Sequence, residues 1–163
     1  MRGIWILLGL CLAAPVAAGE PMVRQLGKAS YYHDRHEGRR TASGEIFDQE
    51  KMTAASPDLP MGWHVTVTDR INGRSVEVRI NDRGPYHPGR VIDLTEEAAE
   101  RLGMKQSGVV PVRVEARPSR QPTEALRQAV LKRAMAATAS KPSPTTPVPG
   151  LIRSAGGETG AAQ

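Results

Sequence analysis

Two stretches in the middle of the chain alternate strictly between apolar and polar residues. In residues 63–68 and again in residues 75–80 every second side chain is apolar, which is typical of a strand with one buried face. Asn72 and Gly73 lie between the two stretches, and both residue types tolerate the positive φ that a two-residue type I′ turn requires. The pattern therefore predicts a β-hairpin.

Shorter apolar runs on either side of this hairpin predict further strands. Residues 27–32, 91–94 and 109–114 each have the length and composition of a short strand. Pro111 cannot donate a hydrogen bond to a neighbouring strand, so it predicts an edge position or a bulge in the last of them. Residues 33–62 are rich in polar and turn-forming side chains and predict long loops with brief strands.

One short helix is predicted over residues 96–102. Thr95 is a favourable N-cap residue, and Glu96 and Glu97 follow it at the positive end of the helix dipole. Gly103 suits the left-handed conformation that ends a helix. Several short strands and one short helix predict an all-β domain, mainly β with this single helix, arranged as a small β-barrel.

The N-terminus has the layout of an export signal. Residues 1–18 begin with Arg2, continue with an apolar stretch and end in small residues, which predicts a signal peptide cut after Ala18. We expect an exported protein of the bacterial periplasm or cell envelope, with no membrane span once the signal is removed. An uncleaved anchor helix is the alternative.

Cys11 is the only cysteine of the chain. A single cysteine excludes both a disulfide scaffold and a zinc site built from cysteines. Cys11 also offers a route to a lipid anchor, but the bulky Leu10 stands where a lipid-attachment site prefers a small residue. We therefore expect no lipid anchor.

The net charge of +5 is concentrated near the C-terminus. Residues 19–116 contain 14 Lys and Arg against 15 Asp and Glu, whereas residues 117–163 contain seven against two. A domain that binds nucleic acid normally carries its own basic patch. The nearly neutral middle of the chain therefore argues against a nucleic-acid partner.

The basic C-terminal part divides into two segments. Residues 117–139 predict a basic helical extension in which Leu126, Val130 and Met135 lie near one face. Residues 140–163 are mostly Pro, Ser, Thr, Ala and Gly and predict a disordered tail. We expect the whole extension to act as a solvated spacer rather than as a contact to acidic wall polymers or lipid.

Asp82 is the strongest candidate for chemistry on its position alone. It follows residues 75–80 with the same parity as their apolar side chains, which places it at a strand end on the core side. Partial burial makes a carboxyl a better general acid near neutral pH. An Asp at a turn also commonly bonds the following amides, here those of Arg83 and Gly84, and the residues alone leave both interpretations open.

Other polar residues can contribute to the same site. Glu45 lies in a polar loop and can line a cleft or remain solvated, and Asp93 interrupts an apolar run just before the helix. Arg83, Tyr86 and Arg90 can line a groove for a polar polymer. As loop residues they carry no specific signal individually.

A cluster of His33, Asp34, His36 and Glu37 has metal-binding residue types at short spacing. Such clusters in polar loops are more often solvated, so we expect no metal. The sequence contains no Ser-His-Asp motif, no phosphate-binding loop and no dinucleotide fingerprint.

Several segments together resemble one known family, the rare lipoprotein A family of bacterial septal-ring lytic transglycosylases. They occur in the family's order at residues 27–32, 40–45, 53–55, 78–86 and 89–95. The resemblance covers roughly residues 25–116. It implies a six-stranded double-psi β-barrel and an envelope enzyme that cleaves peptidoglycan glycan strands, preferring those without stem peptides. It implies no cofactor.

The resemblance also assigns residues. By position, Glu45 and Asp82 match the acidic residues that the family ties to activity, and Asp93 matches an Asp kept before the helix in related barrels. Ser56 stands where family members carry a His. That difference favours an alternative in which the barrel binds or loosens the wall without cutting it.

Two further points qualify the family assignment. His64 or His87 can take the place of the missing His. Some members carry a C-terminal repeat domain that binds denuded glycan, and residues 117–163 are too few and too polar to form one.

Overall fold

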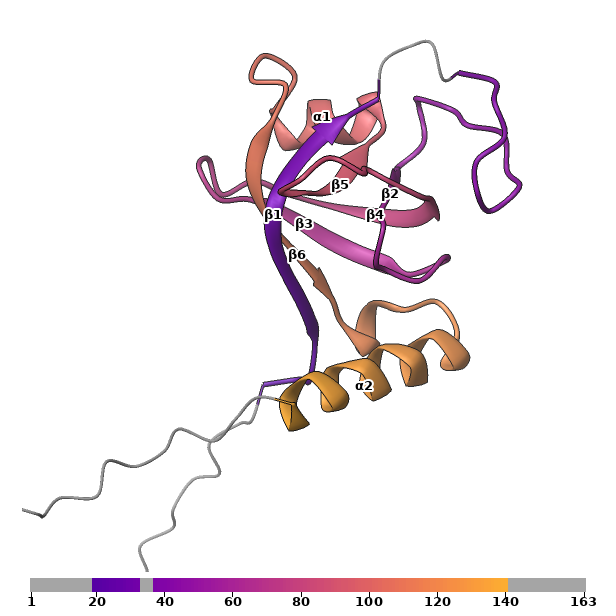
Figure 1. Ribbon diagram of the computed structural model, residues 1–163, viewed down its shortest axis with the longest axis vertical. Coiled ribbons are helices and arrows are strands. Elements are labelled where there is room, and N and C mark those ends of the chain that lie inside the picture. The colour runs from indigo at the N-terminus through magenta and orange to yellow at the C-terminus, as the bar shows by residue number, and fades with distance from the viewer. Residues whose placement is uncertain (1–18, 33–36, 141–163) are drawn as a thin grey trace, which may run out of the picture.

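Six strands close into a barrel in the order β1-β5-β2-β4-β3-β6 (Figure 1). The computed structural model describes residues 19–32 and 37–140. The predicted signal peptide, which includes Cys11, and most of the tail predicted to be disordered lie outside these residues. The strands are β1 (Val23–Tyr31), β2 (Thr53–Ala55), β3 (His64–Asp69), β4 (Ser75–Asp82), β5 (Arg90–Leu94) and β6 (Val110–Ala116). The helices are α1 (Glu96–Leu102), the short 3-10 helix η2 (Pro118–Arg120) and α2 (Glu124–Ala139).

The barrel combines parallel and antiparallel neighbours. β1 runs parallel to β5 and β2 parallel to β4, while the other four pairs are antiparallel. This is the double-psi β-barrel, so the predicted six-stranded fold is confirmed. β6 pairs with both β1 and β3, so Pro111 does not lie on a sheet edge as expected. Pro111 is the second residue of β6 and pairs with Lys28 of β1. The pairing of β6 with β3 ends one residue later along β6, at Val112, so Pro111 has no partner residue within β3.

β3 and β4 form the predicted hairpin, but the predicted two-residue turn is wrong. Residues 70–74 make a wider loop in which Gly73 has φ +75°. The buried carboxylate of Asp69 organises this loop, because its Oδ1 accepts hydrogen bonds from the N–H groups of Ile71 at 2.7 Å and Asn72 at 3.4 Å. Asp69 is only 2% exposed, so its charge needs these donors.

Helix α1 spans the predicted residues, and Gly103 ends it in the left-handed conformation at φ +80°. The predicted capping by Thr95 is wrong, because its side chain makes no cap hydrogen bond. Its hydroxyl donates instead to the carbonyl of Lys51 at 2.5 Å. Gln49 supplies the cap from another loop, since its Oε1 accepts the first helical N–H at 2.9 Å.

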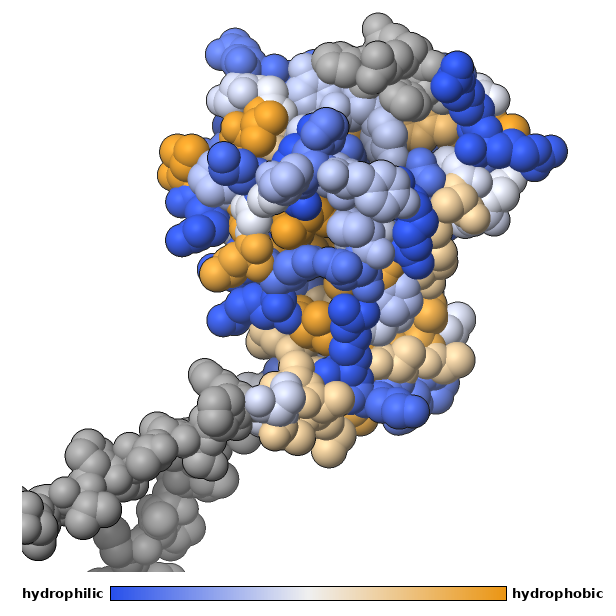
Figure 2. Space-filling model, viewed as in Figure 1, coloured by the Kyte–Doolittle hydropathy of each residue, from blue (hydrophilic) through white to orange (hydrophobic). Residues whose placement is uncertain are grey.

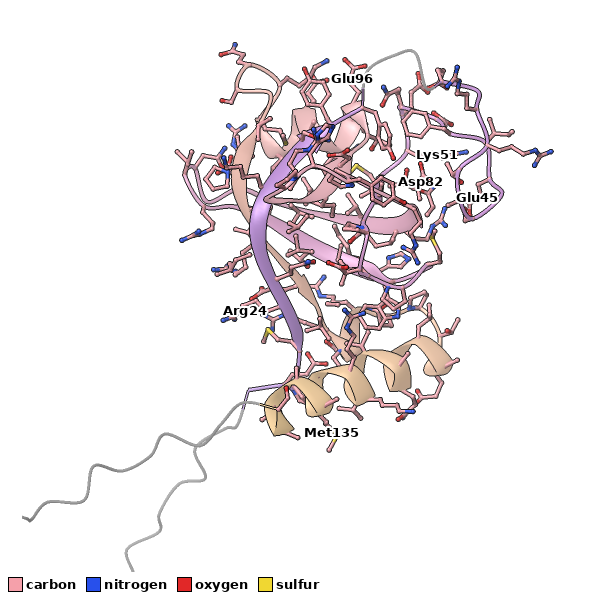
Figure 3. All side chains as sticks on the ribbon, viewed as in Figure 1. Arg24, Glu45, Lys51, Asp82, Glu96 and Met135 are labelled. Carbon is pink, nitrogen blue, oxygen red and sulfur yellow. The ribbon has the colours of Figure 1, made fainter. Side chains whose placement is uncertain are left out.

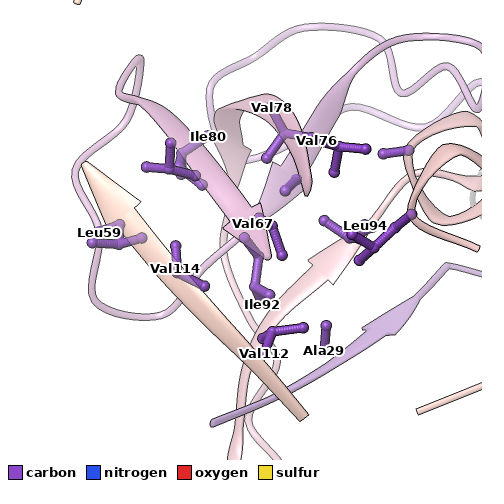
Figure 4. Packing of buried hydrophobic residues seen from close by; sticks show 14 of the residues in the cluster. Ala29, Leu59, Val67, Val76, Val78, Ile80, Ile92, Leu94, Val112 and Val114 are labelled. Carbon is purple, nitrogen blue, oxygen red and sulfur yellow. The ribbon is translucent and has the colours of Figure 1, made fainter. Parts of the chain in front are cut away.

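Aliphatic side chains from all parts of the barrel fill its interior (Figure 4). Val67, Val78 and Ile92 are at most 1% exposed, and Trp63 is the largest buried side chain. The apolar interior leaves the polar candidates no place except at the strand ends and in the connecting loops.

A second helix, α2, packs against one end of the barrel and lies within residues 117–139, for which the sequence predicts a helical extension. α2 lies beneath the strands in Figure 1 and buries Val130 and Ala134, with Leu126 partly buried. These three residues are four apart and form one stripe. Met135 was expected on this face but is 61% exposed, because it lies about 100° around the helix from Ala134.

Side chains of the extension also bond the barrel directly, so the interpretation as a solvated spacer is wrong for its described part. Gln121 is 2% exposed, and its side-chain amide pairs with the backbone of β3 at His64. Its Oε1 accepts a hydrogen bond from the His64 N–H at 2.9 Å, and its Nε2 donates one to the His64 carbonyl at 2.7 Å. Arg133 lies over the Trp63 ring at 5.9 Å and donates to the carbonyl of Asp58 at 2.8 Å. The exposed residues of α2 include the alanines Ala125, Ala129, Ala136, Ala137 and Ala139, and the lower end of the molecule shows pale surface beside blue in Figure 2. None of the described helices is long and apolar enough to cross a membrane.

Candidate active site

The parallel pairing of β1 and β5 brings Ser30 opposite Asp93. Ser30 donates its hydroxyl hydrogen to Oδ1 of Asp93, and Arg90 Nη2 donates to both carboxylate oxygens at 2.8 and 2.6 Å. Asp93 is 9% exposed. A buried carboxylate with a cation and a hydroxyl is compensated and held in one orientation.

Asp82 reaches the same end of the barrel through an irregularity in β4. Ala54 pairs with Ile80 and Ala55 pairs with Asp82, so Asn81 is an extra residue in a β-bulge. The parity expected from the sequence therefore holds only as far as Ile80. The bulge leaves Asn81 buried and places Asp82 half-buried at the strand end.

Three donors surround the Asp82 carboxylate. Its Oδ1 accepts hydrogen bonds from the backbone N–H groups of Ala42 and Arg83, each at 2.8 Å. Its Oδ2 accepts from the hydroxyl of Tyr32 at 2.9 Å. The turn-amide interpretation of Asp82 is thus fulfilled by Arg83. It does not exclude chemistry, because Oδ2 faces a phenol rather than backbone.

Tyr32 interacts with both aspartates, through a hydrogen bond with Asp82 and through the negative charge of Asp93. Burial, and then the negative charge of Asp82, raise the pKa of the Tyr32 phenol far above its usual range, and Asp93 adds to the shift. The phenol therefore keeps its proton. Its ring packs at 59° against Phe47, with ring centroids 4.8 Å apart.

Glu45 lies on the same side of the barrel as Asp82 (Figure 3). Arg79 binds its carboxylate through both terminal nitrogens, at 2.8 and 2.7 Å, and Asn81 Nδ2 adds a contact at 3.2 Å. The hydrogen bonds from Arg79 lower the pKa of Glu45 below its usual range. Glu45 therefore stays ionised and fastens the loop whose Ala42 N–H reaches Asp82.

A cleft of about 530 Å³ with mixed polar and apolar lining opens beside this arrangement. Its lining includes Tyr32, Asp93 and the three residues expected in a groove: Arg83, Tyr86 and Arg90. Tyr86 is 81% exposed. Neither Asp82 nor Glu45 is among the lining residues, but Asp82 adjoins the cleft through its hydrogen-bond partners Tyr32 and Arg83, which line it.

The position of the missing family His lies behind the site. Ser56 is fully buried, its N–H donates to the backbone carbonyl of Asp82 at 3.2 Å, and its Oγ accepts from Leu59 N–H at 3.3 Å. Of the two suggested replacements, His87 lines the cleft, while His64 contacts Glu77 on the outside of the barrel at 3.4 Å.

Arg83 is fixed by backbone rather than by an acid. Its Nη1 donates to the carbonyls of Ser56 at 3.0 Å and Leu59 at 2.7 Å. Within the described residues no three His, Cys, Asp or Glu side chains come together as a metal site. Three of the four residues in the suggested cluster, His33, Asp34 and His36, lie outside them.

Comparison with known families decides what this barrel is. A family model described as lytic transglycolase matches residues 24–114. The chain belongs to this lytic transglycolase family. The resemblance found in the sequence is thereby confirmed.

Two curated relatives are named as enzymes. A Vibrio cholerae protein named endolytic peptidoglycan transglycosylase RlpA is 47% identical over 98 residues, covering 60% of this chain and 37% of that protein. A Nostoc protein, named as a probable enzyme of the same kind, is 59% identical over 91 residues, covering 55% and 24%. The chain thus covers between about a quarter and two fifths of the length of these two relatives. Among solved structures, the Streptomyces papain inhibitor is 26% identical with a TM-score of 0.47, covering 58% of this chain and 96% of that one.

Sequence reasoning missed three parts of the candidate site. The phenol of Tyr32, the guanidinium of Arg79 and the N–H of Ala42 all contact the candidate carboxylates. Tyr32 and Ala42 lie inside segments that carry the resemblance, but neither has a signal of its own. The alternation in residues 75–80 places Arg79 on the polar face of its strand, but it does not reveal the partner of Arg79, Glu45, 34 residues away.

Proposed function

We propose that this chain is an endolytic peptidoglycan lytic transglycosylase. It cleaves the bond between N-acetylmuramic acid and N-acetylglucosamine and leaves 1,6-anhydromuramic ends. The observation that carries the proposal is the Asp82 carboxylate, oriented by Tyr32, Ala42 and Arg83 beside the cleft that Tyr32 and Arg83 line. The family and the names of its relatives support the same reaction.

Asp82 acts as the acid and then as the base. In its protonated form it gives its proton to the glycosidic oxygen, and the bond from that oxygen to C1 of the muramic residue breaks. An oxocarbenium-like state forms at C1. The C6 hydroxyl oxygen of the same sugar attacks C1, and its proton passes to the Asp82 carboxylate. The acid is regenerated and no water is consumed.

The other residues serve binding and electrostatics. Glu45 is held ionised by Arg79, so its negative charge favours the positive charge that develops on the sugar. Asp93 fixes Arg90 at the cleft wall, and Arg83 is fixed by two carbonyls. The exposed ring of Tyr86 offers a flat surface for a sugar face.

Substrate choice and location are further parts of the proposal. The enzyme prefers glycan strands without stem peptides and acts after export, in the bacterial periplasm or cell envelope. The cleft is lined by both charged or hydroxyl-bearing side chains and apolar ones, a mixture that suits the polar edges and apolar faces of a sugar.

Product analysis tests the reaction. The protein is incubated with purified sacculi and with amidase-stripped glycan, and soluble products are identified by mass spectrometry. We expect anhydromuramic ends, reduced by about 10²–10⁴-fold in Asp82→Asn, because removal of a general acid has that effect. Glu77→Gln is the matched control, since Glu77 is another carboxyl on β4 but lies at the outer surface. Reducing ends in place of anhydro ends would instead indicate a hydrolase.

A non-catalytic wall-binding barrel is the second candidate. Ser56 favours it, because a fully buried serine that bonds Leu59 supplies no proton-transfer group to the cleft. In that case the protein would sediment with the glycan, release no product, and be unaffected in binding by Asp82→Asn.

A further inference from the structure

We propose that Tyr32 is a positioning residue that orients Oδ2 of Asp82 and stabilises the negative charge that develops there. This inference rests on the proposed function. It assigns a role to the Tyr32 phenol, whose hydroxyl donates to Oδ2 of Asp82. The argument uses the strand geometry, the distribution of donors on Asp82 and the packing of the Tyr32 ring.

β1 and the residue that directly follows it supply one hydroxyl to each aspartate. Ser30 lies in β1 and Tyr32 follows its last residue, where the Tyr32 N–H still donates to the Leu94 carbonyl of β5 at 2.9 Å, so the extended course of the chain puts the two side chains on the same side. Ser30 bonds Asp93 on the parallel neighbour β5, and Tyr32 bonds Asp82 at the end of β4 at 2.9 Å. The C-terminal end of β1 therefore fixes the spacing between the two carboxylates.

The donors are unevenly shared between the oxygens of Asp82. Among the described residues, Oδ1 receives two backbone N–H groups, whereas Oδ2 receives the Tyr32 hydroxyl alone. The two backbone N–H groups cannot rotate away from Oδ1 and occupy its acceptor positions, so Oδ1 is poorly suited to carry a proton. The transferable proton of Asp82 therefore belongs on Oδ2, the oxygen that Tyr32 orients.

The phenol acts differently on the two protonation states of Asp82. A hydrogen bond to a charged carboxylate is about twice as strong as one to a neutral group. When Oδ2–H gives its proton to the glycosidic oxygen, the Tyr32 hydroxyl stabilises the carboxylate that results. Since the phenol itself keeps its proton, it contributes as a fixed dipole and not as a second acid.

Several charged groups face this pair. Asp93 and Arg90 approach from β5, and Arg83 and Tyr86 from the segment after β4. Glu45, held by Arg79, lies on the other side of the Ala42 loop. All of them remain in a variant that removes only the Tyr32 hydroxyl, so a difference from the parent protein reports that hydroxyl.

Tyr32→Phe tests the proposal with little risk to folding, because the ring that packs against Phe47 is retained. We expect kcat on stripped glycan to fall about 10- to 100-fold, the effect of one hydrogen bond to a charged group, while KM changes less than about twofold. The alkaline limb of the pH–rate profile should move to higher pH, because loss of the donor favours protonated Asp82. An unchanged kcat and pH profile would overturn the proposal.

Tyr31→Phe is the matched comparison. It removes a hydroxyl from the adjacent residue of the same strand, where the hydroxyl donates to the carbonyl of Lys105 at 3.4 Å and not to Asp82. If the two variants lose activity equally and keep the parent pH profile, Tyr32 has only a structural role.

A measurement without substrate separates this inference from the proposed reaction. The carboxyl carbon of Asp82 is followed by ¹³C NMR during a pH titration of the parent, Tyr32→Phe and Tyr31→Phe. We expect the midpoint to move to higher pH only in Tyr32→Phe. A shift in a protein that yields no anhydro product refutes the transglycosylase and retains the Tyr32–Asp82 coupling, whereas an equal midpoint in all three refutes the coupling.

Discussion

The clamp between Arg79 and Glu45 gives the sharpest prediction about the candidate site. Replacing either partner with Gln removes one charge and breaks the two-pronged contact at 2.8 and 2.7 Å. The side chains of Glu45 and Arg79 are 44% and 32% exposed, so solvent screens the pair. The two-pronged geometry places it at the upper end of exposed pairs, and we expect a coupling of about 1 kcal/mol.

The pH dependence follows from the sign of the shift. Arg79 lowers the pKa of Glu45 in the folded protein below its ordinary value of 4.5. The stabilisation is therefore fully present above about pH 4.5 and is lost as pH falls through the lower folded value. We expect the coupling from a double-mutant cycle of Glu45→Gln and Arg79→Gln to be about 1 kcal/mol near pH 6 and to disappear near pH 3.

Urea denaturation of the four proteins at the two pH values measures this coupling, and glycan cleavage measures its consequence. If Glu45 acts only by holding Ala42 against Asp82, both single variants lose similar activity and the double variant loses no more. A much larger loss in Glu45→Gln than in Arg79→Gln means that Glu45 also acts on the sugar by its own charge. A coupling that is absent near pH 6, or equal at both pH values, refutes the electrostatic reasoning.

Two further predictions concern the stability of the barrel. Val130→Ala should lower the free energy of unfolding by about 2 kcal/mol in a urea titration, because the Val130 side chain is fully buried under the barrel. Met135→Ala, on the exposed face of α2, is the control and should change that free energy by less than about 0.5 kcal/mol. Gly27→Ala should cost about 1–3 kcal/mol by the same measurement, because an added Cβ would lie 2.4 Å from Cγ1 of Val91; no loss would mean that β5 moves away without cost.

Much of this fold could be predicted from the sequence because several of its features depend on residues that are close together in the chain. The alternation in β3 and β4, the acidic first turn of α1 and the glycine after it all act within a few residues. The errors arise where a distant group takes over. Thr95 faces the carbonyl of Lys51 and leaves the cap to Gln49, and Asp69 reshapes the hairpin loop with its buried charge.

The site was predictable only in part for the same reason. Asp82 and Asp93 could be selected because a carboxyl in or directly after an apolar stretch is unusual, and Glu45 because the family resemblance assigns it. Their partners could not, since Tyr32 contacts Asp82 across 50 positions and Arg79 contacts Glu45 across 34. Periodicity specifies which face a side chain occupies, but barrel closure decides which side chain it meets.

The pairing of the first strand with the last has a consequence for when this protein can become active during its synthesis. β1 and the residue directly after it carry the hydroxyls that bond both aspartates, and the antiparallel partner of β1 along Val23–Ala29 is β6, near the end of the barrel sequence. A growing chain that has released β5 but not β6 therefore has every candidate side chain, yet lacks the strand that closes the barrel around them. Contacts so distant in sequence form late and slowly. The arrangement couples the proposed cutting activity to completion of the barrel, so a chain truncated before Val110 should contain the whole set of candidate site residues and release no glycan product.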